Sequence, residues 1–146
     1  MGRAPVEQGK GNGERAALAA DADSDLARLA AALEETELAL VVAGSHFDAR
    51  YRNAHRILAR VEDPDALAEL RSALRCAPGA QRMDWTTPGD PTIALFAADR
   101  QYRAAVTAIA PDHLRSPGLL EGDVLLAEPE RLIRWLTATA RSTHGA

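Results

Sequence analysis

The sequence predicts an α+β protein in which helices pack on one face of a small antiparallel sheet of two to four strands. A capped amphipathic helix begins after Asp63, two strand-like runs follow at 92–97 and 102–109, and another amphipathic helix begins at Pro129. Only four residues separate the two strand-like runs, so we expect them to pair as a hairpin. Strands grouped between helices, rather than alternating with them, favour α+β over a parallel α/β sheet.

The chain of 146 residues fits one domain of ordinary size. Residues 1–22 alternate glycine with polar residues and contain few large apolar ones, which predicts a disordered tail. We therefore expect a single domain over 23–141 and a frayed C-terminus over 142–146.

The first half of the domain contains one clear helix and two ambiguous segments. A helix is expected from Ser24, capped by Asp23 or Ser24. The apolar run over 37–43 fits a buried strand or a continuing helix, and we expect the helix. Beyond it, a loop or short helix through Asn53 and then a strand over 56–62 are expected.

The second half is more clearly marked. Asp63 suits an N-cap and Pro64 the first helical position, and Leu70 lies in the middle of the apolar stripe of this helix. A short strand over 83–86 is expected to precede the hairpin. Proline and glycine at 111, 117 and 118 predict a loop between the hairpin and the last helix. The residues of that helix expected to face inward are Leu132, Ile133, Leu136 and Ala140, with Trp135 in the core or at its edge.

Composition excludes several classes of protein. The net charge of −4 argues against a dedicated nucleic-acid binder, although sixteen of the seventeen basic residues are arginine. Cys76 is the single cysteine, so neither an internal disulfide nor a cysteine-rich zinc site is possible. No signal peptide is evident and the longest apolar run is far too short to span a bilayer, which predicts a cytoplasmic protein without a membrane partner.

The sequence offers little support for catalysis. The four histidines form no paired ligand motif, and neither a nucleophile elbow nor a phosphate-binding glycine loop is present. A small hydrolase or other enzyme with a site near His46, Asp48 and His113 is one alternative, but nothing in the sequence brings these residues together. Cys76 follows a helix C-terminus and is expected to be an inert, partly buried thiol. No cofactor or metal is predicted.

The most suggestive local feature is a cluster of arginines: Arg50, Arg52, Arg56 and Arg60. On a helix the last three would share one face and could meet acidic groups or phosphates. Trp85, in a loop-like context, is a second candidate contact residue. We therefore expect a non-enzymatic binding or regulatory module that acts through contacts with another protein. A nucleic-acid binder using the arginine patch is a further alternative.

Two stretches carry a resemblance to known proteins: Ile57-Leu58-Ala59-Arg60-Val61 with Asp63-Pro64-Asp65-Ala66-Leu67, and Gly122-Asp123-Val124-Leu125-Leu126-Ala127-Glu128 with Leu132-Ile133-Arg134-Trp135-Leu136. Over roughly the last 90 residues the chain resembles a group of small, uncharacterised actinobacterial proteins. Members of that group often carry His and Cys just before the hairpin, where this chain has Gln81-Arg82-Met83-Asp84. The resemblance implies a fold unit and no activity.

Overall fold

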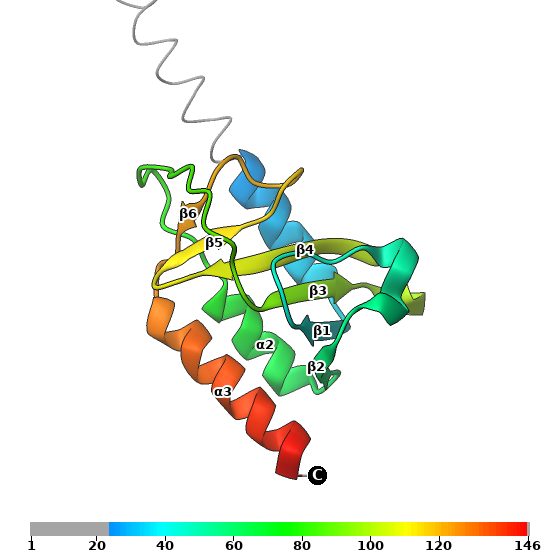
Figure 1. Ribbon diagram of the computed structural model, residues 1–146. Coiled ribbons are helices and arrows are strands. Elements are labelled where there is room, and N and C mark those ends of the chain that lie inside the picture. The colour runs from blue at the N-terminus through cyan, green and yellow to red at the C-terminus, as the bar shows by residue number, and fades with distance from the viewer. Residues whose placement is uncertain (1–23, 146) are drawn as a thin grey trace, which may run out of the picture.

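The computed structural model describes residues 24–145, and the tail expected over residues 1–22 lies outside them (Figure 1). A helix over 24–35 is followed by these elements: β1 Leu38–Val42, the 3₁₀ segment η1 Ala49–Ala54, β2 Ile57–Val61, α2 Pro64–Ala73, β3 Thr92–Phe96, the 3₁₀ turn η2 Ala98–Arg100, β4 Tyr102–Ile109, β5 His113–Arg115, β6 Val124–Leu125 and α3 Pro129–Gly145. The α+β class is confirmed. The fraying expected over residues 142–146 stays a prediction.

The strands form one antiparallel sheet of six, in the order β2-β1-β3-β4-β5-β6. The predicted hairpin is confirmed as β3 and β4, and the strand expected over 56–62 as β2. The expectation of two to four strands is wrong, because β1, β5 and β6 also join the sheet. β5 and β6 have three and two residues and lie among proline and glycine, so neither is long enough to show a period.

The helix expected over 37–43 is a strand. All five β1 residues are buried. Ala39 and Val41 belong to the core on one face of the sheet, whereas Leu40 and Val42 belong to the cluster on the other. A strand covered on both faces loses the alternation of apolar and polar residues, so its run of apolar residues looks like part of a buried helix.

All three helices contribute to the main core, on one face of the sheet. α2 and α3 pack against each other (Figure 1). Asp63 caps α2 as predicted, since its Oδ2 accepts a hydrogen bond from the backbone N–H of Ala66 at 2.9 Å. The main core combines the following residues: Leu29 and Leu33 from the first helix, Leu67 and Leu70 from α2, Leu132 and Trp135 from α3, and Ala39, Val41, Ile93 and Leu95 from the strands.

The inward face of α3 differs in part from the prediction. Leu132 and Trp135 are buried, and Leu136 is half-buried against the core. Ile133 is 55% exposed, so its expected inward position is wrong. It lies one residue, or about 100° of helix rotation, from Leu132 and so points away from the stripe that 132, 135 and 136 form.

The opposite face of the sheet is covered by two segments that contain no α-helix, residues 43–56 and residues 80–91. Phe47, from the first segment, packs on a second cluster of Leu38, Leu40, Val42, Ala94 and Phe96. Gly89, from the second, lies so close to β4 that a Cβ atom there would come within 2.5 Å of the Ala108 carbonyl oxygen. We call this side of the sheet the loop-covered face. The short strand expected over 83–86 is reduced to one bridge, from Met83 to Asp123.

Among residues 24–145, no helix combines the length and apolar character that a bilayer crossing requires.

Candidate functional site

The four arginines predicted as a binding cluster do not share a helix face. Arg50 and Arg52 belong to η1, Arg56 lies between η1 and β2, and Arg60 is in β2. The expected short helix followed by a strand is what the chain adopts here, so the alternative in which Arg52, Arg56 and Arg60 align on one helix does not apply.

Two of these arginines are paired within the protein. Arg50 donates to the carboxylate of Asp48, with Nη2 and Oδ2 3.2 Å apart, while its side chain stays 80% exposed. Arg60 donates to Glu62 at 3.0 Å. Arg56 is exposed and forms no ion pair with any residue between 24 and 145. Its charge is therefore available to a partner.

The loop-covered face also carries most of the exposed apolar surface. Within residues 24–145, five large apolar side chains are exposed: Tyr51 63%, Ile57 46%, Trp85 36%, Tyr102 38% and Ile133 55%. All but the last belong to this face or to the segments that cover it. Such side chains are common anchors of protein interfaces.

The sheet register places two of these residues on the face. Ile57 lies opposite Val42, and Tyr102 lies opposite Phe96. Directly paired residues project from the same side of a sheet. Both pairs lie next to a register shift, between Val41 and Val42 and between Leu95 and Phe96. The ring contacts of Tyr102 with Phe47 and Phe96 place it on the loop-covered face, and the pairing with Val42 assigns Ile57 to the same face.

An aromatic stack holds the segment over residues 43–56 on the sheet. The ring of Phe47 meets Phe96 edge-on at 5.9 Å and stacks with Tyr102 at 5.8 Å between centroids. The ring of His55 also stacks with that of Phe47, with 4.8 Å between the centroids. Tyr51 lies further along the same segment and carries the guanidinium of Arg50 at 5.6 Å from its ring centroid.

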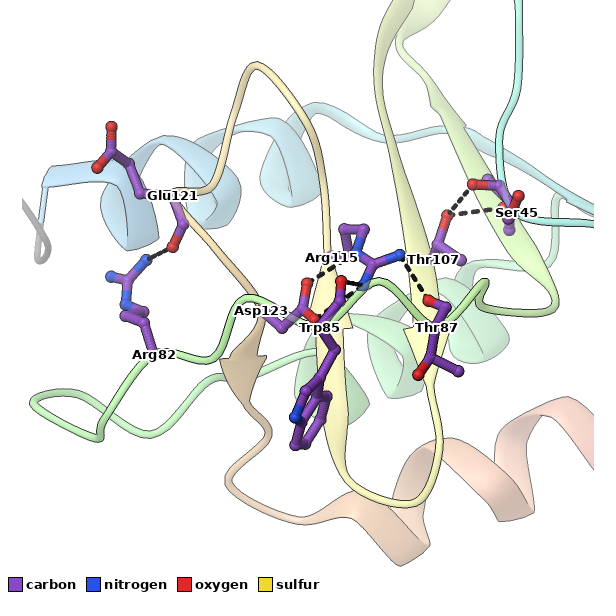
Figure 2. Close-up of polar contacts among 9 residues, drawn as sticks. Ser45, Arg82, Trp85, Thr87, Thr107, Arg115, Glu121 and Asp123 are labelled. Atoms are coloured by element: carbon purple, nitrogen blue, oxygen red, sulfur yellow. Dashed lines mark hydrogen bonds and ion pairs between the residues drawn. The ribbon is translucent and has the colours of Figure 1, made fainter.

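Threonine hydroxyls fix the start of the same segment. Thr92 Oγ1 donates to the carbonyl of Gly44 at 2.9 Å, and Thr107 Oγ1 donates to the carbonyl of Ser45 at 3.2 Å. The backbone N–H of Gly44 also donates to Asp90 at 2.7 Å. Figure 2 shows the Ser45 to Thr107 contact beside β4. This segment therefore has a defined position over a rigid sheet.

Trp85 lies in the second covering segment, which Arg115 anchors. The Arg115 guanidinium donates to both oxygens of Asp123 and to the carbonyls of Trp85 and Thr87, at 2.7 to 2.9 Å (Figure 2). The Trp85 ring meets His113 edge-on at 4.7 Å. Trp85 is thus both a partial cover for the sheet and, at 36% exposure, accessible to a partner.

The residues of the alternative enzyme site make separate contacts. His113 contacts Asp112 and Trp85, whereas His46 lies beside His55, 5.7 Å between ring centroids. In the described part of the chain, no three His, Cys, Asp or Glu side chains are grouped so that they could hold a metal ion. His46, Asp48 and His113 therefore form no metal site within residues 24–145.

Cys76 has the surroundings expected of an unreactive thiol. It borders a cavity of about 400 Å³ between the first helix and α2, which four leucines line together with polar and charged residues, and its Sγ donates to the Leu74 carbonyl at 3.6 Å. Burial raises the pKa of this thiol to about 11. The thiolate, which is the reactive form, is therefore scarce at neutral pH.

The chain matches no known protein family, no curated protein and no solved structure. The site must therefore be interpreted from its own geometry.

Sequence reasoning identified the arginines and Trp85 but missed Tyr51, Ile57 and Tyr102. In the sequence Tyr51 lies between Arg50 and Arg52, and Ile57 directly follows Arg56. Apolar residues among arginines are typical of protein interfaces, so this pattern could have indicated Tyr51 and Ile57. Tyr102 gave no such signal, because its membership of this face depends on pairing with Phe96.

Proposed function

We propose that the protein is a non-enzymatic binding module that contacts another protein through the loop-covered face. The observation that carries the proposal is that four of the five exposed large apolar side chains among residues 24–145 belong to this face or to the segments that cover it, spread from β2 to β5: Tyr51, Ile57, Trp85 and Tyr102. Arg50 and Arg56 lie in or next to the first of these segments, and Arg60 lies in β2. Tyr, Trp and Arg are the residues that most often dominate the binding energy of protein interfaces.

The charge of the segment favours an acidic partner surface. Residues 44–62 contain four arginines and two acids, Asp48 and Glu62, whereas the whole chain has a net charge of −4. Charge of this kind governs the rate and specificity of association and is screened by salt. Apolar anchors beside it would supply the desolvated centre of the interface.

Nucleic acid fits this surface less well than protein does. Arg50 and Arg60 already pair with carboxylates, and these acids would repel phosphates. Exposed tyrosine and isoleucine are more useful against an apolar protein surface than against a phosphate backbone.

The test is affinity capture from the source cell with the parent chain and three single variants. We expect Tyr51→Ala and Arg56→Glu each to reduce the captured partner at least tenfold, which corresponds to about 1.4 kcal/mol. Ile133→Ala is the matched control, since Ile133 is similarly exposed but lies on α3, and it should capture as the parent does. Capture should also fall as salt rises from about 50 to 200 mM.

Two results would contradict the proposal. One is a partner retained equally by parent, Tyr51→Ala and Arg56→Glu but lost by Ile133→Ala. The other is a salt-sensitive gel shift with nucleic acid that Arg56→Glu abolishes in the absence of any captured protein.

A further inference from the structure

The backbone at the start of η1 is closed by a histidine side chain. The N–H of Asp48 donates to Nε2 of His55 at 2.9 Å, across seven residues of chain. Asp48 also accepts two hydrogen bonds within the turn. Its Oδ1 accepts from the Arg50 N–H at 3.0 Å, and its backbone carbonyl accepts from the Tyr51 N–H at 3.0 Å. The His55 contact therefore closes the turn that presents Arg50 and Tyr51.

This hydrogen bond requires one form of the imidazole ring. A ring nitrogen that accepts a hydrogen bond carries no proton, so His55 must be neutral with its proton on Nδ1. In the protonated ring both nitrogens are donors. Nε2–H and the Asp48 N–H would then be two donors facing each other, and the contact would become repulsive.

We propose that His55 is a pH-sensitive latch, which holds the η1 turn closed when neutral and releases it when protonated. Histidine is the side chain whose ordinary titration range lies between pH 5 and 8. The latch rests on the proposed function for its biological meaning, because the turn it holds carries Tyr51, but its chemistry can be tested without a partner.

The neighbouring groups influence the latch in opposite directions. The carboxylate of Asp48 attracts a protonated ring, and the stack on Phe47 tolerates one through a cation–π contact. His46, whose ring lies 5.7 Å away, adds like charge when it is also protonated, and Arg50 competes for the same carboxylate. From β4, Tyr102 presents a phenol near Asp48. Arg56 follows His55 in the chain and adds positive charge nearby.

These contacts suggest how the released turn rearranges. A protonated His55 ring relieves the donor–donor contact by turning toward the Asp48 carboxylate, which displaces Arg50 from it. The closure between residues 48 and 55 is then lost, and the η1 segment that carries Tyr51 is held less firmly. Binding through Tyr51 should therefore weaken as the pH falls and His55 becomes protonated.

The direct test is amide hydrogen exchange at Asp48 in the full chain, compared at pH 7.5 and pH 5.5 after correction for the intrinsic rates. We expect exchange in the parent to be faster at pH 5.5, because a protonated ring no longer accepts the hydrogen bond from the Asp48 N–H. His55→Gln should show no such acceleration, because a glutamine side-chain oxygen can accept the same hydrogen bond and does not titrate. His46→Gln removes like charge beside the ring but keeps the Asp48 contact, so it should still show an acceleration.

A second measurement covers the possibility that His55→Gln packs badly. The ¹⁵N shifts of the His55 ring at pH 7.5 should show a proton on Nδ1 and none on Nε2. A proton on Nε2 at that pH, an unchanged exchange rate in the parent, or the same acceleration in His55→Gln would each overturn the latch.

The latch and the proposed function fail in distinguishable ways. If exchange responds to pH but partner capture through Tyr51 is absent at every pH, the latch stands and the binding proposal fails. If capture depends on Tyr51 but exchange at Asp48 does not respond to pH, the binding proposal stands and the latch is overturned.

Discussion

Two arginines bind carboxylates that are almost fully buried. Arg82 donates to both oxygens of Asp25, 1% exposed, at 2.9 Å, and Arg115 donates to both oxygens of Asp123, 2% exposed. The backbone N–H of Glu121 also donates to Asp25 (2.9 Å). These pairs tie the irregular residues around 80–91 to the first helix and to β5. They are chemically complementary, and removing one partner would leave a buried charge.

We expect Arg82→Met to lower the free energy of unfolding by about 3 kcal/mol at pH 7, because Asp25 would stay buried and unpaired. Arg50→Met, which removes an exposed surface pair, should cost much less. Urea titration of both variants measures the difference. An effect of Arg82→Met as small as that of Arg50→Met would show that Asp25 reaches solvent.

The pH dependence of the Arg82–Asp25 pair follows from the direction in which the pKa of Asp25 is shifted. Hydrogen bonds from Arg82, and to a lesser extent from Glu121, lower the pKa of Asp25 below its usual value. The pair's contribution to stability is therefore complete above about pH 4 and is lost as the pH falls through the lowered pKa. In Arg82→Met the same carboxyl is favoured in its protonated form. The stability difference between parent and variant should therefore shrink between pH 7 and pH 3, and a constant difference would contradict this.

Cys76 supplies a residue-scale test of burial. With its pKa raised to about 11, only about one thiol in a thousand is ionised at pH 8, against roughly one in four for an unperturbed thiol. We expect a thiol reagent to modify the native protein at least about a hundredfold more slowly than the protein in denaturant. Equal rates would show that the cavity beside Cys76 opens freely.

At the scale of the element, the contribution of a helix residue to stability depends on whether its side chain faces the core. Leu70 is 1% exposed in α2, whereas Ile133 is 55% exposed in α3. Leu70→Ala should lower the free energy of unfolding by about 2–5 kcal/mol, and Ile133→Ala by less than about 1 kcal/mol. The shift of the denaturant midpoint, in variants whose unfolding free energy depends on denaturant with the parental slope, measures both losses. If Ile133→Ala lowered the free energy of unfolding more than Leu70→Ala does, α3 would have to be rotated about its axis so that Ile133 faces the core.

The covering segment over residues 80–91 depends on Gly89. A Cβ atom at this position would come within 2.5 Å of the Ala108 carbonyl oxygen and of side-chain atoms of Thr107 and Ile109. Gly89→Ala should therefore lift the segment from β4 and cost about 1–3 kcal/mol. Hydrogen exchange over residues 84–91 should rise more than exchange in α2. A variant with parental stability and exchange would show that the segment does not pack on β4 at this point.

At the scale of the whole molecule, the sequence was informative wherever local chemistry determines structure. The Asp63 cap, the Pro64 start and the hairpin between β3 and β4 depend on neighbouring residues and were predicted correctly. β1 was not, because a strand buried on both faces has no local period. β5 and β6 were missed because they are short and depend on pairing with distant strands.

The same distinction applies to the candidate site. Arg50, Arg56, Arg60 and Trp85 could be named from the sequence because their residue types are suggestive by themselves. Their common location could not be predicted, since it depends on which face each strand presents and on the two segments that cross it. The His55 contact to Asp48 is likewise a product of the turn between them.

The most direct test of the central claim is photo-crosslinking from a single position. A photoreactive amino acid is placed at Tyr51 on the loop-covered face or, in a matched protein, at Ile133 on α3, and each chain is irradiated in the source cell. Our account predicts a discrete crosslinked product with one acidic protein from position 51 and none from position 133. The same product from position 133 alone, or products of equal yield from both positions, would contradict the claim that the loop-covered face is the binding surface.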